Sequence, residues 1–253
     1  MTKLEKAILP LEYETYVFDL YGTLVDINTD ENKEELWKKI AMFYGYYGAI
    51  YDPSEMKGEY ERLVKGKEKE LKSTLAGDPK YAHEASPEIE ITDVFLELFE
   101  QKGVKAAREL AMHAGQFFRV LATEFICLYP GTREMLVALK NAGKKVYLLS
   151  NAQRIFTEYE MRCIDIFKYF DAVLISSDYK TKKPDKRFFD ALIDEQALDS
   201  HNTLFIGNDS KNDIEGAKQV DFATFYVKSD ISPDGDFAPM ADYSVNNFTR
   251  WEY

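Results

Sequence analysis

The chain has 253 residues, 45% of them hydrophobic and 30% charged, which suits one large domain or a domain with an insertion. Its formal net charge of −12 disfavours non-specific binding to nucleic acid or to an anionic membrane surface, so we expect neither partner. Two cysteines without metal-type spacing favour a reducing, cytoplasmic compartment over a disulfide framework. No stretch has the length of a transmembrane helix or the apolar core of a signal peptide, and the oligomeric state stays open.

The first predicted strand ends at an aspartate. Tyr16, Val17 and Phe18 form a short apolar run that is typical of a buried strand. Asp19 follows this run, and Gly22 then breaks the strand pattern. Open α/β sheets bind their ligands at the carboxyl ends of the strands, so Asp19 is a candidate for chemistry. Taken alone, the Asp-x-x-Gly-Thr stretch is more simply interpreted as a turn, because short motifs arise by chance.

Residues 28–125 are predicted to form a separate helical unit, inserted after the first strand. Apolar residues recur there at helical spacing, and no strand is convincing. The helical segments are 36–47, 56–64, 94–99 and 117–125. The predicted division is therefore a core of residues 1–27 and 126–253, with 28–125 as the insertion.

From residue 129 onward, strand patterns alternate with helix patterns. The predicted strands are 144–149, 172–175, 203–206 and 223–227. This alternation predicts right-handed crossovers and a parallel sheet with helices on both faces. The expected fold class is therefore α/β, with a doubly wound parallel sheet.

Polar side chains follow successive predicted strands, and in such a sheet the loops after the strands share one edge. They are Asp19, Ser150 with Asn151, Lys183, and Asp209 with Asp213. A carboxylate can attack an electrophile and form a covalent intermediate, and serine and asparagine can donate hydrogen bonds to an oxyanion. A lysine supplies positive charge that suits phosphate, and several carboxylates together offer oxygen ligands to magnesium.

Four segments, in this order, resemble the four motifs of the haloacid dehalogenase (HAD) superfamily. They are Asp19-Leu-Tyr-Gly-Thr-Leu, Leu-Leu-Ser150-Asn151, Lys183-Pro184-Asp185 and Ile-Gly-Asn208-Asp209-Ser-Lys-Asn-Asp213. Each motif alone is weak evidence, but four motifs in order are strong evidence. The resemblance covers residues 15–27 and about 126–230. It implies a Rossmann-like core with a helical cap inserted after the first motif.

The resemblance also implies a reaction and a metal, because most members of that superfamily are magnesium-dependent phosphatases. Asp19 would be the nucleophile and would form an aspartyl-phosphate. Magnesium would be bound by Asp19, by the main-chain carbonyl of Tyr21, and by Asp209 and Asp213. The expected substrate is a small phosphorylated metabolite.

The same resemblance assigns residues to the phosphoryl group. Thr23, Ser150 and Lys183 would position and neutralise it, which is electrostatic stabilisation of a transferring phosphoryl. Gly22 and Asn151 are the remaining candidates for phosphate contact.

Two positions depart from the superfamily pattern. Phosphatases usually carry a second aspartate two residues after the nucleophile as general acid and base, and this chain has Tyr21 there. Losing such help typically costs about 10²–10⁴-fold in rate, and a phenol with a pKa near ~10 is a poor base at neutral pH. A good leaving group, a water relay or a substrate that supplies its own acid would then be needed. Asn208 stands where many members have aspartate, which leaves the direct metal ligand open between Asp209 and Asp213.

Tyr21 also favours a second hypothesis, because 2-haloacid dehalogenases of the superfamily carry a tyrosine there and displace a halide that needs no proton. Asp209 and Asp213 favour the metal-binding phosphatase instead. A third hypothesis is a weakly active protein that mainly binds a small molecule.

Arg119 and Arg154 could reach toward an anionic substrate, but surface salt bridges are the favoured expectation for both.

Overall fold

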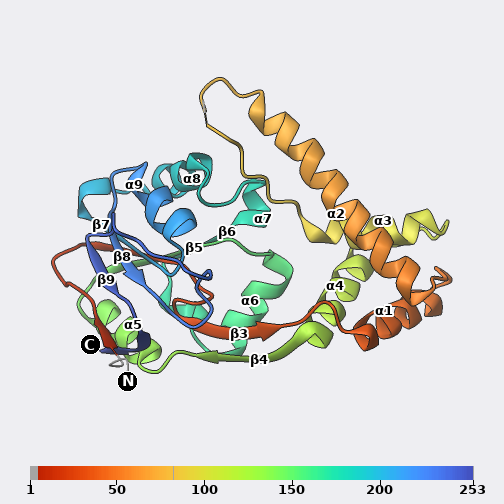
Figure 1. The fold of residues 1–253 in the computed structure, drawn as a ribbon, viewed down its shortest axis with the longest axis horizontal. Helices are drawn as coiled ribbons and strands as arrows, with labels where there is room; N and C mark the ends of the chain where they lie inside the picture. Colours follow the sequence, from red (N-terminus) through yellow and green to blue (C-terminus); the bar gives the residue numbers. More distant parts are fainter. Residues whose placement is uncertain (1–4, 82, 253) are drawn as a thin grey trace.

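The computed structural model describes residues 5–81 and 83–252, and its centre is a parallel sheet (Figure 1). Among these residues, six strands are hydrogen-bonded in the order β6-β5-β2-β7-β8-β9, and each neighbouring pair is parallel. The bounds are β2 Thr15–Phe18, β5 Lys145–Ser150, β6 Ala172–Ile175, β7 Thr203–Gly207, β8 Ala223–Val227 and β9 Tyr243–Val245. The predicted α/β fold with a central parallel sheet is confirmed.

Strand β2 lies between β5 and β7 in the interior of the sheet, and its side chains are buried on both faces. Tyr16 and Phe18 pack on one face, which is covered by the helices that follow β4 and β5. Val17 packs on the other face, because successive side chains of a strand point in opposite directions. The covering helices are α5 (Thr132–Asn141) and α6 (Arg154–Cys163) on the first face, and α8 (Lys186–Gln196) and α9 (Gly216–Lys218) on the second.

Short helical segments complete the core. They are η1 (Phe167–Tyr169), α7 (Ser176–Tyr179), η2 (Ser200–Asn202) and η3 (Ser210–Glu215). The helix predicted after the fourth motif therefore begins as η3, a single π-helical stretch, before α9 continues it. Such stretches are frequently found at functional sites.

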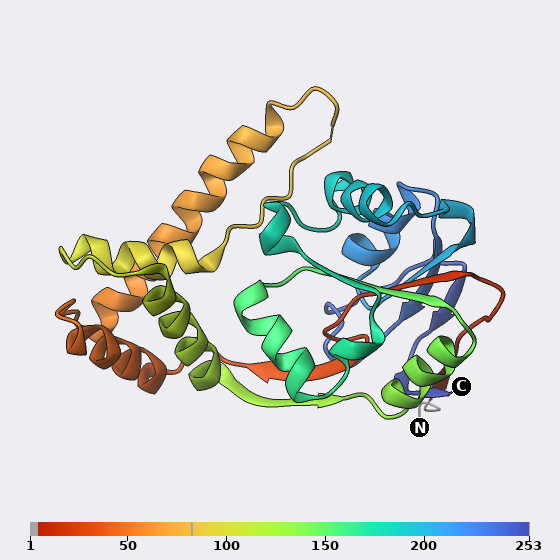
Figure 2. The same ribbon diagram turned by 180° about the vertical axis from the view of Figure 1, so that it is seen from behind.

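Four helices form a bundle beside the sheet, which we call the helical unit (Figures 1 and 2). They are α1 (Glu34–Tyr46), α2 (Pro53–Ala76), α3 (Ile91–Gln101) and α4 (Arg108–Ala122). Their apolar faces build a core of their own, in which the rings of Tyr44 and Phe99 stack with centroids 4.0 Å apart. All four lie within residues 28–125, and the division of the chain into two domains at those bounds stays a prediction.

Helix α2 has a well-defined start and a charged surface. The carboxylate of Asp52 accepts the N–H of Ser54 and forms a capping box with Glu55, which satisfies donors that the first turn leaves open. Lys67 further along pairs with Glu97 of α3 at 2.7 Å. Within the described ranges, no helix combines the length and the apolar character that crossing a membrane requires.

A two-stranded antiparallel ribbon joins the helical unit to the sheet (Figure 1). It consists of β3 (Val25–Thr29) and β4 (Thr123–Leu128). The expectation of no strand within 28–125 is therefore wrong at both ends of that range. The reason is that β3 has the sequence VDINT, whose polar residues are partly exposed, and its partner strand lies far along the chain. The chain ends pair in the same non-local way, as β1 (Glu5–Ile8) with β10 (Phe248–Glu252).

A second connection is made by residues 83–90, which lie between α2 and α3 and which we call the strap. Pro87 forms an antiparallel bridge with Thr181 of the core. The N–H of Ser86 donates to the carboxylate of Asp185 at 3.0 Å. The strap thus docks on the core segment that carries the third motif.

Candidate active site

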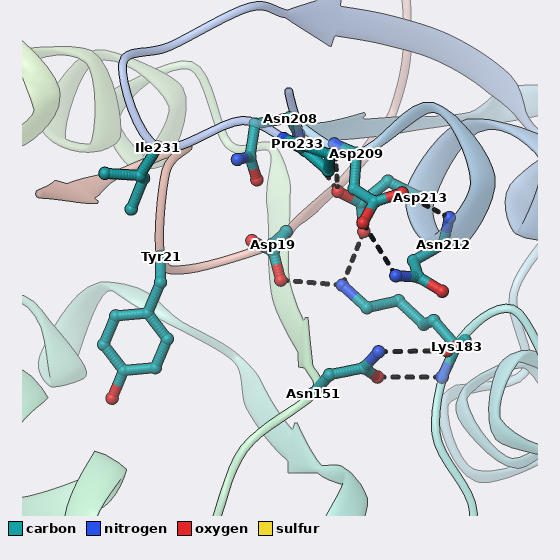
Figure 3. A pocket seen from close by; sticks show the side chains of 10 residues that line it. All are labelled: Asp19, Tyr21, Asn151, Lys183, Asn208, Asp209, Asn212, Asp213, Ile231 and Pro233. Carbon is teal, nitrogen blue, oxygen red and sulfur yellow. Dashed lines mark hydrogen bonds and ion pairs between the residues drawn. The ribbon is translucent and has the colours of Figure 1, made fainter. Parts of the chain in front are cut away.

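A cleft of about 260 Å³ opens at the carboxyl edge of the sheet, beyond strands β2 and β7 (Figure 3). Its lining is Asp19, Tyr21, Asn151, Lys183, Asn208, Asp209, Asn212, Asp213, Ile231 and Pro233. The lining contains the sequence-predicted site residues except Gly22, Thr23 and Ser150, which are buried. Loops from distant parts of the chain therefore meet at one edge, as the alternating pattern predicted.

The loop after β2 is shaped to carry Asp19. The N–H of Asp19 donates to the carbonyl of Ile206 at 2.9 Å, which extends the pairing of β2 with β7 past the end of the strand. Gly22 has φ +85°, and a Cβ added there would lie 2.1 Å from Nδ2 of Asn208. Glycine is thus required both by the backbone and by the close approach of Asn208. Thr23 donates to Asn208 Oδ1 at 3.4 Å, so both residues support that amide.

Lys183 is the centre of a buried ion-pair network. Its ammonium lies 2.7 Å from Asp19 Oδ1 and 2.7 Å from Asp213 Oδ1, and its side chain is 1% exposed. Burial by itself lowers the pKa of Lys183, but the two carboxylates outweigh burial and hold this pKa above its ordinary value. Lys183 is therefore a fixed positive charge beside Asp19.

Asn151 holds the main chain of Lys183 with a pair of hydrogen bonds. Asn151 Oδ1 accepts from the N–H of Lys183 at 2.8 Å, and Asn151 Nδ2 donates to its carbonyl at 3.0 Å (Figure 3). The amide thereby links the loop after β5 to the loop after β6. It positions the lysine, and its predicted phosphate contact stays a prediction.

Asp213 uses both of its carboxylate oxygens within the protein. Oδ1 accepts from Lys183, and Oδ2 accepts from the N–H groups of Asn208 and Asp209, both at 3.0 Å. A Cβ at Gly207 would lie 2.3 Å from Oδ2, so glycine makes room for the carboxylate. Burial raises the pKa of Asp213 above the usual carboxyl range, and the Lys183 ammonium opposes this shift.

Asp209 caps the π-helical stretch η3. Its Oδ1 accepts the N–H groups of Lys211 at 3.0 Å and of Asn212 at 2.8 Å, and its Oδ2 accepts from Asn212 Nδ2 at 2.7 Å. Both acids predicted as metal ligands, Asp209 and Asp213, thus have oxygens engaged by protein groups. Their assignment as ligands stays a prediction.

Ser150, at the end of β5, is 1% exposed. Among the described residues, its hydroxyl has no hydrogen-bond partner. A buried polar group without a partner costs roughly 1–3 kcal/mol, which a bound oxygen atom would offset. This hydroxyl therefore lacks a protein partner, and its predicted contact with a phosphoryl group stays a prediction.

The side chain of Tyr21 points away from the carboxylate of Asp19 (Figure 3). Its hydroxyl donates to the carboxylate of Glu160 in α6 and lies 3.1 Å from Thr157 Oγ1. Burial raises the pKa of Tyr21, and the charge of Glu160 raises it further. The phenol is therefore held as a neutral donor to α6.

Arg119 of the helical unit completes this arrangement. Its guanidinium pairs with Glu160 at 2.6 Å and lies 5.9 Å from the ring centroid of Tyr21. The two charged side chains are 18% and 10% exposed, so the prediction of a surface salt bridge is wrong for Arg119. Arg154 does form a half-exposed pair, with Asp178 at 2.6 Å. Contacts therefore run from the Asp19 loop through α6 to the helical unit.

Comparison with known families agrees with the motifs. The model of the haloacid dehalogenase-like hydrolase family matches residues 13–221, which is most of the chain. The chain belongs to this family. It is accordingly a hydrolase, and its parallel sheet is the HAD-like, Rossmann-type fold that the resemblance implied.

Relatives within the HAD-like hydrolases include both phosphatases and dehalogenases. A phosphoglycolate phosphatase of Nitrosospira multiformis is 27% identical over 86% of this chain and 84% of its own length. The (S)-2-haloacid dehalogenase 4A of Burkholderia cepacia is 24% identical over 92% of this chain and 91% of its own. A solved structure of the Bacillus subtilis HAD-hydrolase YfnB, bound to magnesium, is 18% identical, covers 93% of this chain and 95% of its own, and has a TM-score of 0.50.

The HAD resemblance implies a magnesium ion, and the oxygen atoms that line the cleft show whether the cleft can bind one. Within the described ranges, no three His, Cys, Asp or Glu side chains are grouped so that they could hold a metal. Magnesium, however, needs only one or two carboxylates when water and phosphate complete its shell. Asp19, Tyr21 and Asn208 line the same cleft and offer a carboxylate, a main-chain carbonyl and an amide oxygen. The residues present fit a magnesium ion of this kind.

Sequence reasoning missed several residues of this HAD-like site. Ile231 and Pro233 line the cleft from the loop after β8, and the rule that loops after parallel strands share an edge predicts them. Asn212 lies next to the predicted acid of the fourth motif, which is also a usable signal. Glu160 carries no signal in the sequence, because it lies mid-helix and meets Tyr21 only in the folded chain.

Proposed function

We propose that this HAD-like hydrolase is a phosphatase of a small phosphorylated metabolite and that it forms an aspartyl-phosphate on Asp19. The observation that carries the proposal is the carboxylate of Asp19, which has one oxygen on a buried ammonium and the other unengaged in an open cleft. A carboxylate held in this way is an oriented nucleophile. The size of the cleft, about 260 Å³, suits a small substrate.

The residues divide the chemical work in the following way. The unengaged oxygen of Asp19 attacks phosphorus, while the Lys183 ammonium orients the carboxylate and offsets charge on the phosphoryl oxygens. The unpaired hydroxyl of Ser150 donates to a phosphoryl oxygen and gains the partner that it lacks. Water then attacks the phosphorus and releases phosphate, which restores the carboxylate.

Magnesium would be held by the Asp19 carboxylate, the main-chain carbonyl of Tyr21 and the amide oxygen of Asn208. A bound magnesium ion supplies positive charge that neutralises phosphoryl oxygens. Asp209 and Asp213 would act behind these ligands, by capping η3 and by holding Lys183. Titration calorimetry with magnesium alone tests this set, since Asn208→Ala would weaken binding in the absence of any substrate.

We further propose that the helical unit is the cap of the enzyme. It contacts the Asp19 loop through Arg119 and Glu160, and the strap connects it to the segment that carries Lys183. A lid of this kind excludes water from the reacting phosphoryl group, and its opening commonly limits turnover.

The decisive test is phosphate release from 4-nitrophenyl phosphate with and without magnesium. Asp19→Asn keeps the shape of the side chain but removes the nucleophile, so kcat/KM should fall at least about 10³-fold. The matched control is Asp234→Asn, an exposed acid in the loop that also carries Pro233, and it should keep wild-type turnover. Equal activity of wild type and Asp19→Asn would contradict the proposal.

A second candidate function is 2-haloacid dehalogenation. The Tyr21 hydroxyl is bound to Glu160 and is not presented to Asp19, so it is not placed to protonate a leaving group. A halide leaves without a proton, and this arrangement therefore favours dehalogenation. Halide release from 2-chloropropionate that persists without magnesium would favour this candidate over the phosphatase. Binding of inorganic phosphate without turnover of either substrate would favour a binding protein with weak activity.

A further inference from the structure

The cleft is rich in ionisable side chains, and each already has a protein partner. Those that line it are Asp19, Tyr21, Lys183, Asp209 and Asp213. A group that departs from phosphorus needs a proton only if it is a strong base, and a positioned acid typically contributes about 10²–10⁴-fold in rate. The question is therefore which of these side chains has a proton to give beside Asp19.

The tyrosine is turned away from the reaction. Its ring points away from the Asp19 carboxylate, and its hydroxyl proton is already donated to Glu160 (Figure 3). Thr157 lies at 3.1 Å from the same hydroxyl, and Arg119 holds Glu160 in place at 2.6 Å. Bringing the hydroxyl to a leaving group would leave a buried carboxylate short of a donor.

The remaining groups are acceptors or are fixed between acceptors. Three N–H groups donate to the oxygens of Asp209, and two main-chain N–H groups with the lysine ammonium donate to Asp213. Lys183 does carry protons, but giving one away would leave a neutral amine between two buried carboxylates, at 2.7 Å from each. Among the residues that line the cleft, none is therefore placed to protonate a leaving group.

We propose that the site is specialised for phosphoryl groups on an oxygen that departs as a stable anion, which means acyl phosphates or phosphoanhydrides and not alkyl phosphate esters. This inference rests on the proposed aspartyl-phosphate chemistry. It identifies the substrate class of the same site.

Both half-reactions proceed without a protein side chain that donates a proton. One oxygen of Asp19 forms a bond to phosphorus, the bond from phosphorus to the leaving oxygen breaks, and its electron pair stays on that oxygen, which departs as an anion. In the second half, a water oxygen bonds to phosphorus and the Asp19–phosphorus bond breaks, with its electron pair returning to the carboxylate. The proton of the attacking water passes to solvent, and the aspartyl-phosphate is itself an acyl phosphate whose leaving group is a carboxylate.

The test is a series of phosphates of decreasing leaving-group acidity: acetyl phosphate, 4-nitrophenyl phosphate, phenyl phosphate and ethyl phosphate. We expect kcat/KM to fall at least about 10²-fold from the 4-nitrophenyl to the phenyl ester, whose phenol has a pKa near ~10. Equal values for the two esters would overturn the inference, because a water relay or an unrecognised acid would then supply the proton. A preference for acetyl phosphate over pyrophosphate would assign the acyl class, and the reverse preference would assign the anhydride class.

Two variants of Tyr21 sharpen the result. Tyr21→Asp puts a short carboxyl group two residues after Asp19, where the HAD resemblance places the general acid, so it should narrow the difference between the two aryl esters at least about 10-fold. Tyr21→Phe removes the hydroxyl but keeps the ring, and it should leave that difference as it is in the wild type. Selective loss of the phenyl ester in Tyr21→Phe would identify the hydroxyl as the proton donor and would overturn the inference.

Failure of the inference is distinguishable from failure of the proposed function. A flat series whose turnover still depends on Asp19 would overturn only the substrate class. The absence of phosphate release from acetyl phosphate and from every ester would overturn the phosphatase itself. Intact-protein mass spectrometry after mixing with acetyl phosphate gives an independent readout, because the wild type should gain one phosphoryl group and Asp19→Asn should not.

Discussion

The two sides of the Asp19 loop are built from the same kinds of interaction but belong to different parts of the molecule. On one side, Lys183 bridges Asp19 and Asp213, and these residues all come from the core. On the other side, Tyr21 donates to Glu160 of the core, and Glu160 pairs with Arg119 of the helical unit. The first set lies entirely within the core, whereas the second depends on contact between the core and the helical unit.

The difference lies in what each side requires. The lysine network is formed by side chains of the sheet and its loops, so none of its ion pairs needs a partner from the helical unit. The tyrosine contacts are complete only while α4 lies against α6, so they report the position of the helical unit to the Asp19 loop. The ion pairs of Lys183 thus form a permanent side of the Asp19 loop. The contacts of Tyr21 form a position-dependent side, because they require the helical unit to lie against the core.

The largest expected effect comes from breaking the permanent side. Lys183→Met would leave Asp19 and Asp213 as buried carboxylates without their shared cation, so the free energy of unfolding should fall by about 3–5 kcal/mol. The kcat/KM of any phosphatase activity should also fall about 10²–10³-fold or more. Urea denaturation and phosphate release measure the two effects.

The control for this variant is Lys211→Met, which removes an exposed lysine from η3, the stretch that also carries Asp213. Its free energy of unfolding should stay within about 0.5 kcal/mol of the wild type. An equal urea midpoint for Lys183→Met and Lys211→Met would mean that the buried carboxylates do not depend on the ammonium.

Breaking the position-dependent side should have an intermediate effect. Arg119→Met leaves Glu160 largely buried with fewer donors, so the free energy of unfolding should fall by about 1–3 kcal/mol. Proteolysis of the ribbon between the helical unit and the sheet should become faster. Arg62→Met is the control, because its pair with Glu59 at 2.7 Å is exposed and is worth less than about 1 kcal/mol. Identical proteolysis of both variants would show that Arg119 does not hold the helical unit.

The smallest expected effect is a change in alkaline stability. Burial and Glu160 raise the pKa of Tyr21 in the folded chain, so the folded state keeps a proton that the unfolded chain releases above pH ~10. This contribution is fully present below pH ~10 and is lost as the pH rises toward the folded-state pKa. At pH 7, Tyr21→Phe should be less stable by about 1 kcal/mol for the lost hydrogen bond. The difference should shrink above pH 10 in urea denaturation, and a constant difference would contradict the assignment.

The sheet and the lysine side of the site follow closely from the sequence. The strands predicted at 172–175 and 223–227 coincide with β6 and β8, because short, largely apolar runs rich in β-branched and aromatic residues are typical of strands buried on both faces. The meeting of Asp19 with Lys183 also follows, because the topology of parallel strands brings their loops to one edge.

The tyrosine side and the ribbon do not follow from local patterns. Arg119 and Glu160 are 41 residues apart and meet only because two separately predicted helices pack together. Strand β3 is polar and half exposed, and its pairing partner lies beyond the whole helical unit, so no local periodicity marks it. Contacts of this kind are decided by tertiary packing, which sequence patterns do not encode.

The strap changes how the helical unit can move. The ribbon alone would attach the helical unit along one edge, but the strap also holds it to the core, at Pro87 by Thr181 and at Ser86 by Asp185. Because the ribbon and the strap both attach the helical unit, we expect it to rock about the line that joins these two attachments. A larger motion would require the strap to release from the core. Since Thr181 and Asp185 flank Lys183, each such rocking would pull on the very turn that sets the lysine against Asp19. Any force on the helical unit would then reach the lysine that pairs with Asp19.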